Sequence, residues 1–212
     1  MFESFDLASM LIRIVPLLFA LTVHEYAHAL AAYHCGDDTA RLNGRLTLDP
    51  LAHLDFLGTL CLLFGPFGWA KPVPVNPYNF RHPRRDDIIV SLAGVTANLA
   101  TAIAVALVMR LTLGFGLWAT RVGAIAWNML FLLCLMSVGL MLFNLIPLPP
   151  LDGSHVVRNL LPYEKARAYD RLTPLAPFIL LVLVLTPAIR YVLMWPLERI
   201  LVGLLGPVVA GL

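Results

Sequence analysis

The chain has 212 residues, a length that fits one domain, and 59% of them are hydrophobic while 13% are charged. Soluble globular domains are about 45–50% apolar and about 25% charged, so this composition excludes disorder and most soluble folds. The net charge of +2 is too small to indicate a nucleic-acid partner, and three scattered cysteines indicate no disulfide framework. We therefore expect a single integral domain over residues 1–212 in a lipid bilayer.

Apolar segments long enough to cross the bilayer recur along the chain, since a spanning helix needs about 20 mostly apolar residues. Residues 88–109 and 122–151 contain no charge, and residues 7–32 and 172–189 are also candidates. The C-terminal run within 196–212 is too short to span alone, so the sequence leaves open whether it crosses the membrane. We expect an all-α, polytopic membrane helix bundle with about four to six transmembrane segments.

Residues 56–77 are apolar too, but glycines and prolines interrupt them. For residues 56–70 a re-entrant hairpin or an interfacial loop fits better than a span. Residues 71–77 alternate prolines with β-branched residues, which indicates extended backbone. This stretch is either a stiff connector, which we favour, or an edge to which an unwound chain could add as a strand. A short extended or re-entrant segment is therefore expected near residues 56–77.

Counts of Lys and Arg indicate an orientation in the membrane. Residues 35–87 hold six and residues 152–173 hold four, whereas residues 1–6 hold none and residues 110–121 hold two. Because cytoplasmic loops carry an excess of positive charge, the two rich segments are expected in the cytoplasm and the N-terminus outside. The C-terminal ends of the first span and of the 122–151 span then face the same side.

Residues 24–28 read His-Glu-Tyr-Ala-His, an HExxH motif. On a helix, positions i and i+4 share a face, so His24 and His28 can reach one metal ion, with Glu25 placed as a general base. The alternative is a polar pair facing the inside of a bundle. An ionisable group in mid-membrane costs about 2.5–3.5 kcal/mol, however, and three such groups within one turn indicate a function. The motif predicts one zinc ion per chain.

A catalytic zinc ion takes a third protein ligand. His34 stands where HExxHxxGxxH has its third histidine, but Ala31 replaces the glycine. Without that glycine the helix is expected to continue and to carry His34 away from the metal. We therefore do not expect His34 to be the third ligand.

Asp152 is the stronger candidate for the third ligand. Three prolines at 147, 149 and 150 cannot continue a helix and force irregular backbone at membrane depth, directly before Asp152. Gly153 is expected to give the chain freedom to turn the carboxylate inward. The alternative is that Asp152 caps a helix that begins near Ser154. The predicted orientation favours a ligand, because it brings Asp152 to the same side as His24 and His28.

These residues resemble the site-2 protease family of intramembrane zinc metalloproteases. That family pairs HExxH with N-x-x-P-x-x-x-L-D-G on another helix, and this chain has the pair at 24–28 and 144–153. Residues 68–77 resemble the loop of its small, PDZ-less bacterial members. The resemblance implies that His24, His28 and Asp152 bind zinc and that Glu25 is the catalytic base.

A third element of the family is the asparagine of G-P-x-x-N, proposed to help hold the substrate carbonyl. This chain reads Gly-Val-Thr-Ala-Asn at 94–98, with Val95 in place of proline. Asn98 is therefore expected either to contact the substrate in the transition state or to form a helix–helix hydrogen bond. Asn144 is expected to position the broken helix.

The resemblance implies a hydrolase of regulated intramembrane proteolysis, a metalloendopeptidase that cleaves a single-pass membrane protein or a signal-peptide remnant. We expect a multi-pass protein of the plasma membrane whose active site opens toward the cytoplasm. One alternative is a divalent-metal transporter, which one compact ligand cluster disfavours. The other is a catalytically silent membrane adaptor, which the intact motifs disfavour. The sequence does not define the substrate, the cleavage position, the gating mechanism or the oligomeric state.

Overall fold

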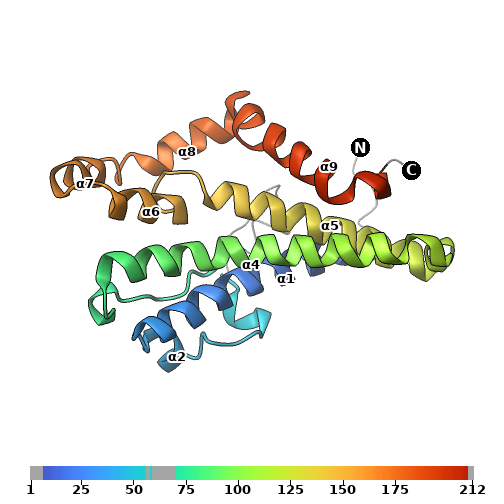
Figure 1. Ribbon diagram of the computed structural model, residues 1–212, viewed down its shortest axis with the longest axis horizontal. Coiled ribbons are helices and arrows are strands. Elements are labelled where there is room, and N and C mark those ends of the chain that lie inside the picture. Colours follow the sequence, from blue (N-terminus) through green and yellow to red (C-terminus); the bar gives the residue numbers. More distant parts are fainter. Residues whose placement is uncertain (1–6, 56–57, 59–69, 210–212) are drawn as a thin grey trace.

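The computed structural model describes residues 7–55, 58 and 70–209, and most of these are helical (Figure 1). The α-helices are α1 (Leu7–Cys35), α2 (Thr39–Leu42), α4 (Pro83–Thr112), α5 (Arg121–Asn144), α6 (Asp152–Leu160), α7 (Tyr163–Asp170), α8 (Ala176–Leu185) and α9 (Trp195–Val209). Short 3₁₀ turns lie at Pro50–His53, Pro77–Asn79, Leu113–Phe115 and Leu117–Ala119, and a π turn lies at Arg190–Met194. The described residues contain no β-strand beyond one isolated bridge, which confirms the all-α class.

Three long helices, α1, α4 and α5, form the bundle, and each packs against the other two. Within the described chain, three helical stretches are long and apolar enough to cross a membrane: Met10–Cys35, Pro83–Phe115 and Arg121–Asn144. They confirm a membrane helix bundle. The expected total of about four to six transmembrane segments goes beyond these three and stays a prediction.

Prolines determine where two of the expected spans end. The span expected over 122–151 stops at Asn144, and its last seven residues are not helical, as the three prolines predict. The candidate span over 172–189 is not one continuous helix, because α8 covers 10 residues and ends at Leu185. Thr186, which precedes Pro187, has extended backbone (φ −103°, ψ 160°), the conformation that a following proline favours.

One end of the bundle brings together segments that are far apart in sequence. The end of α1, the start of α4, the end of α5, and α6 and α7 gather at one end of the molecule (Figure 1). The Arg81 amide donates to the Cys35 carbonyl across 3.1 Å, and α6 packs on α4. The expectation that α1 and the 122–151 span end on the same side is confirmed.

Residues 70–76 are extended, and Asp37 holds their C-terminal end. The Asp37 side chain is fully buried and accepts hydrogen bonds from the Asn76 amide (2.7 Å), the Asn79 side chain (2.8 Å) and the Thr39 amide (3.1 Å). Burial alone would raise the pKa of Asp37, but these hydrogen bonds outweigh it and hold the pKa below its usual value. A buried carboxylate therefore joins the end of α1 to the extended segment.

The other end of the extended segment is held by backbone contacts. The Lys71 amide donates to the His53 carbonyl across 2.9 Å, and the Arg45 guanidinium donates to the Lys71 carbonyl. Leu54 and Ala70 form the antiparallel bridge. The expected extended segment is thus confirmed over 70–76, whereas residues 56–57 and 59–69 lie outside the described part of the chain.

Replacing Asp37 by asparagine is expected to lower the free energy of unfolding in detergent by about 1–3 kcal/mol at pH 7. The NH₂ group of the asparagine would be a buried donor that faces the N–H groups from which the carboxylate now accepts hydrogen bonds. Since the folded-state pKa of Asp37 is lowered, its stabilisation is present at neutral pH and is lost as the pH falls through that pKa. The Asp37→Asn variant should therefore lose less stability on acidification than the wild type.

Asp38→Asn is the matched control for thermal or denaturant unfolding. Asp38 is 47% exposed and pairs with Arg41 at 2.9 Å, and exposed ion pairs contribute about 0–1 kcal/mol. Equal losses of stability in the two variants would contradict the role given to Asp37.

Candidate metal centre

His24 and His28 lie one turn apart on α1 and face the same side, as the motif predicts. Both are buried, their ring centroids are 4.5 Å apart, and the rings are nearly perpendicular at 85°. The two Nε2 atoms are 3.0 Å apart. This arrangement presents two imidazole nitrogens to one point.

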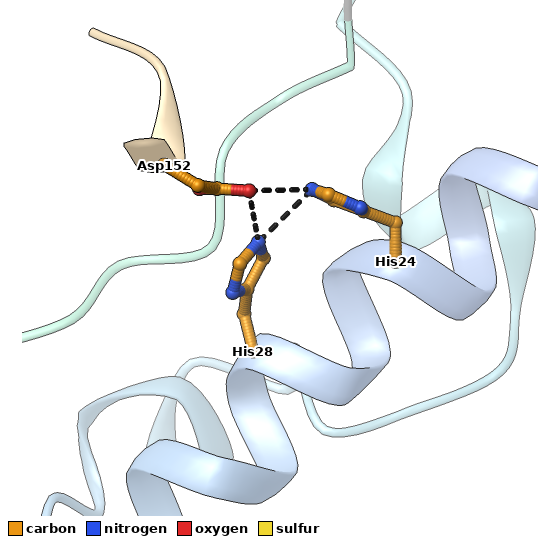
Figure 2. Close-up of side chains that lie close together, drawn as sticks. All are labelled: His24, His28 and Asp152. Atoms are coloured by element: carbon orange, nitrogen blue, oxygen red, sulfur yellow. Dashed lines mark hydrogen bonds and ion pairs between the residues drawn. The ribbon is translucent and has the colours of Figure 1, made fainter. Parts of the chain in front are cut away.

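Asp152 completes the cluster from a distant part of the chain (Figure 2). It is the first residue of α6, and its Oδ2 lies 3.2 Å from Nε2 of His24 and 3.4 Å from Nε2 of His28. The alternative interpretation as a helix cap is wrong, because α6 is capped at Leu151 and has no side-chain capping bond. The possible ligand atoms of the three residues all lie within 4.8 Å of one another.

The cluster fits a zinc ion. Oδ2 of Asp152 is buried and has no hydrogen-bond partner among the described residues. Ligand bonds of about 2.0–2.2 Å in a tetrahedron place neighbouring ligand atoms about 3.3 Å apart. The observed separations of 3.0, 3.2 and 3.4 Å match that spacing. Two imidazoles and one carboxylate are also a donor set that zinc takes in hydrolases.

α4 fixes the ring of His28 from behind. The Nδ1 atom of His28 lies 2.7 Å from the carbonyl oxygen of Val90. Because a carbonyl only accepts, Nδ1 carries the proton and Nε2 keeps its lone pair. His28 is therefore held in the tautomer that binds a metal through Nε2.

Gly94 leaves the space that the two imidazoles occupy. A Cβ atom at this position would lie 2.5 Å from Nε2 of His28 and 2.6 Å from Cε1 of His24. The backbone of Gly94 has no positive φ, so the requirement is for space and not for conformational freedom. α4 continues without a break through Val95, which is buried in the core in place of the proline of the family motif.

Gly153 has a different role from the expected one. It has no positive φ, so it does not serve to turn the chain. Its Cα instead packs on the carbonyl group of Leu145, and an added Cβ would collide with that oxygen. Gly153 thus lets α6 start directly against the end of α5, which places Asp152 at the histidines.

Glu25 lies beside the cluster and contacts the extended segment. The Val73 amide donates to its Oε2 across 3.0 Å. A cavity of about 460 Å³ is lined by Glu25, Val73, Asn144 and the three cluster residues, among others. The Asn144 side chain donates to the Leu140 carbonyl of its own helix at 3.0 Å. The polar residues of the two motifs therefore meet at one cavity, with Glu25 at its wall.

Asp87 and His155 form a polar pair that the sequence analysis missed. The Asp87 carboxylate is buried, lies 3.4 Å from Nδ1 of His155 and accepts a hydrogen bond from Asn159. The contact with Asp87 raises the pKa of the His155 imidazole. Both residues line the metal-site cavity and a second hollow of about 910 Å³. They stand at the junction of the two.

A pattern in the sequence could have identified the face of α4 that contacts α1. Asp87, Ser91, Gly94 and Asn98 follow one another at intervals of four, three and four, so they share one face of a helix, and all four are buried. His34, in contrast, is exposed near the end of α1 and contacts the Tyr33 ring. The prediction that it lies away from the cluster is confirmed.

Asn98 lies on the far side of His24 from the cavity. Its Nδ2 is 3.1 Å from Nδ1 of His24, so the two residues link α4 to α1. Asn98 is fully buried and does not line the cavity.

Comparison with known proteins agrees with this geometry. The model of peptidase family M50 matches residues 119–186, which include α5, the break and Asp152. A Bacillus subtilis protein named "Putative zinc metalloprotease YwhC" is 38% identical over 197 residues, which cover 92% of this chain and 90% of that protein. The chain belongs to peptidase family M50.

Two less similar relatives, each named "Putative zinc metalloprotease Rip2", come from Mycolicibacterium smegmatis and Mycobacterium tuberculosis. Both are 32% identical over 178 and 179 residues, covering 82% of this chain and 66% of each relative. No solved structure matches the chain. Membership in M50, the site-2 protease family, together with the apolar helices, makes the chain a membrane-embedded metalloendopeptidase.

Gly94→Ala is expected to lower the zinc affinity of this M50 chain by about 10–100-fold or more, because the added methyl group displaces both imidazoles. Gly139→Ala is the control, since a Cβ there meets no atom within 4 Å. Zinc content after purification and competition with a chelator measure the effect. Wild-type zinc affinity in Gly94→Ala would contradict the role assigned to this glycine.

Proposed function

We propose that this M50 chain is an intramembrane endopeptidase that binds one zinc ion through His24, His28 and Asp152. It would hydrolyse a peptide bond within or near the transmembrane segment of a membrane-anchored protein. The observation that carries the proposal is the convergence of two imidazoles and one orphaned carboxylate oxygen, at 3.0–3.4 Å from one another, beside Glu25 in a cavity between membrane helices.

Zinc, when bound, would polarise the scissile carbonyl and make a water molecule acidic enough to lose a proton near neutral pH. Glu25 is the group that receives this proton. The Val73 amide binds its Oε2, and Oε1 accepts no hydrogen bond from the described residues. Oε1 can therefore take the proton from the attacking water and deliver it to the leaving amine.

The substrate has to expose its backbone at the cavity. In a helix every interior amide is bonded within the segment, and no water in the bilayer core compensates for an opened bond. Substrates with helix-breaking residues near the cleavage site are therefore favoured. The substrate class that we propose is a single-pass membrane protein or a signal-peptide remnant, as the resemblance to the family implies.

The cavity is lined by residues of both Lys- and Arg-rich segments, among them Ala70 and Asp87 of 35–87 and Asp152 and His155 of 152–173. By the positive-inside rule these segments face the cytoplasm, so we place the opening of the active site on the cytoplasmic side of the plasma membrane.

Labelling of single cysteines tests this orientation in a background without the three native cysteines. A membrane-impermeant maleimide should leave Lys165→Cys, on the exposed surface of α7, unmodified in intact cells and modify it after permeabilisation. Gly114→Cys, in the turn after α4 at the opposite end, should react in intact cells. The reverse pattern would refute the orientation.

Glu25→Gln is expected to lower the rate of cleavage by a purified enzyme by at least about 10²–10⁴-fold, because the amide cannot take a proton. Its zinc content should equal that of the wild type, since Glu25 is not among the ligands. Asp152→Ala should lose both zinc and activity, whereas His34→Ala should keep both.

These variants also separate the proposal from its alternatives. A metal transporter would move zinc across vesicle membranes in the Glu25→Gln variant as in the wild type, and a silent adaptor would cleave no substrate in any form. Cleavage at the wild-type rate by Glu25→Gln would refute the mechanism. Loss of zinc in His34→Ala but not in Asp152→Ala would refute the ligand set.

A further inference from the structure

The buried amide of Asn98 has one atom without a partner. Asn98 is 0% exposed, its Nδ2 lies 3.1 Å from Nδ1 of His24, and its Oδ1 has no hydrogen-bond partner within the described part of the chain. Rotation of the amide exchanges its donor and its acceptor, so the tautomer of His24 decides which of the two faces the ring.

Metal binding would fix the tautomer of His24. When Nε2 of His24 binds a metal, its lone pair is used and Nδ1 carries the proton, so Nδ1 becomes a donor. The Nδ2 group of Asn98 would then place a second donor against it. Rotating the Asn98 amide by half a turn about its last side-chain bond places Oδ1 at the same position, where it accepts this proton.

The NH₂ group of the amide can pair with the other tautomer of His24. With a proton on Nε2 of His24, facing Asp152 or His28, Nδ1 has a lone pair and accepts from Nδ2 of Asn98. An asparagine can pair with either tautomer by turning its amide, whereas the Val90 carbonyl behind His28 can only accept.

We propose that Asn98 is a positioning residue whose Oδ1 accepts the Nδ1–H of His24 in the zinc-loaded protein and so fixes the ring for coordination. The inference rests on the proposed zinc site. It differs from the substrate contact that the family resemblance implies, because Asn98 lies behind His24 and does not line the cavity. The partner of a metal-bound imidazole orients it and increases its basicity.

The register of the two helices supports this assignment. On α4, Val90 contacts His28, Gly94 leaves room for both imidazoles, and Asn98 contacts His24. These three positions are spaced by four residues, so one stripe of α4 serves both histidines. Val90 and Asn98 therefore occupy equivalent places behind the two rings.

The test compares Asn98→Asp with Asn98→Leu. Aspartate keeps an acceptor of the same shape, while leucine has a similar size and no acceptor. Zinc affinity is measured by competition with a chelator, and the rate of zinc release is measured after the chelator is added in excess. We expect Asn98→Leu to bind zinc about 10–100-fold more weakly and to release it faster, and Asn98→Asp to keep or exceed the wild-type affinity.

The thermal unfolding of each zinc-free variant controls for a loss of fold, and Asn98→Ala replaces the leucine variant if that one does not fold. If Asn98 only fills space, the zinc affinity of Asn98→Leu should equal that of the wild type, which is the reverse of our expectation. Wild-type zinc affinity in Asn98→Leu would overturn the inference, even if the protein cleaves its substrate. Weakened zinc binding in this variant supports it whether or not cleavage of a chosen substrate is observed.

Discussion

Where α4 crosses α1, the absence of a side chain at Gly94 lets the backbone of one helix touch two imidazoles of the other. The close approach of the two helices determines where the other groups of the metal centre lie. It brings the Val90 carbonyl within 2.7 Å of one ring and Asn98 within 3.1 Å of the other. It also leaves Nε2 of both histidines facing outward to Asp152. A side chain at residue 94 would separate the helices and remove all of these contacts together.

The chemistry of a polar cluster inside an apolar bundle explains why so many partners surround it. A buried polar group that lacks a hydrogen bond is costly, and a membrane offers no water to replace the missing partner. The rings, Glu25 and Asp87 each have a hydrogen-bond partner from another segment, whereas Oδ2 of Asp152 has no hydrogen bond among the described residues and faces the two imidazole nitrogens at 3.2 and 3.4 Å. A cation bound between Asp152 and the two histidines would join α1 to α6 and so stabilise the packing of these helices.

Much of the fold and the candidate ligand set could be predicted from the sequence because the signals are local. The HExxH spacing places two histidines on one helix face, and three prolines near the end of the 122–151 segment place Asp152 after a helix end. The charge counts then predicted that these ends lie together. The residues of α4 were harder to predict, because a helix face shows which side chains lie together but not which neighbour they contact. Glu25 meets Val73 only because distant contacts at Asp37 and His53 hold the extended segment.

The extended segment has a property that follows from its alternating prolines. Proline has no N–H group, so Pro72 and Pro74 cannot donate a hydrogen bond to a carboxylate. Val73, between them, supplies the bond to Glu25. A slip of the segment by one residue in either direction would place a proline opposite the carboxylate and break that bond. The segment thus cannot shift by one residue against α1 without losing this bond, so the two prolines help to keep Val73 aligned with Glu25.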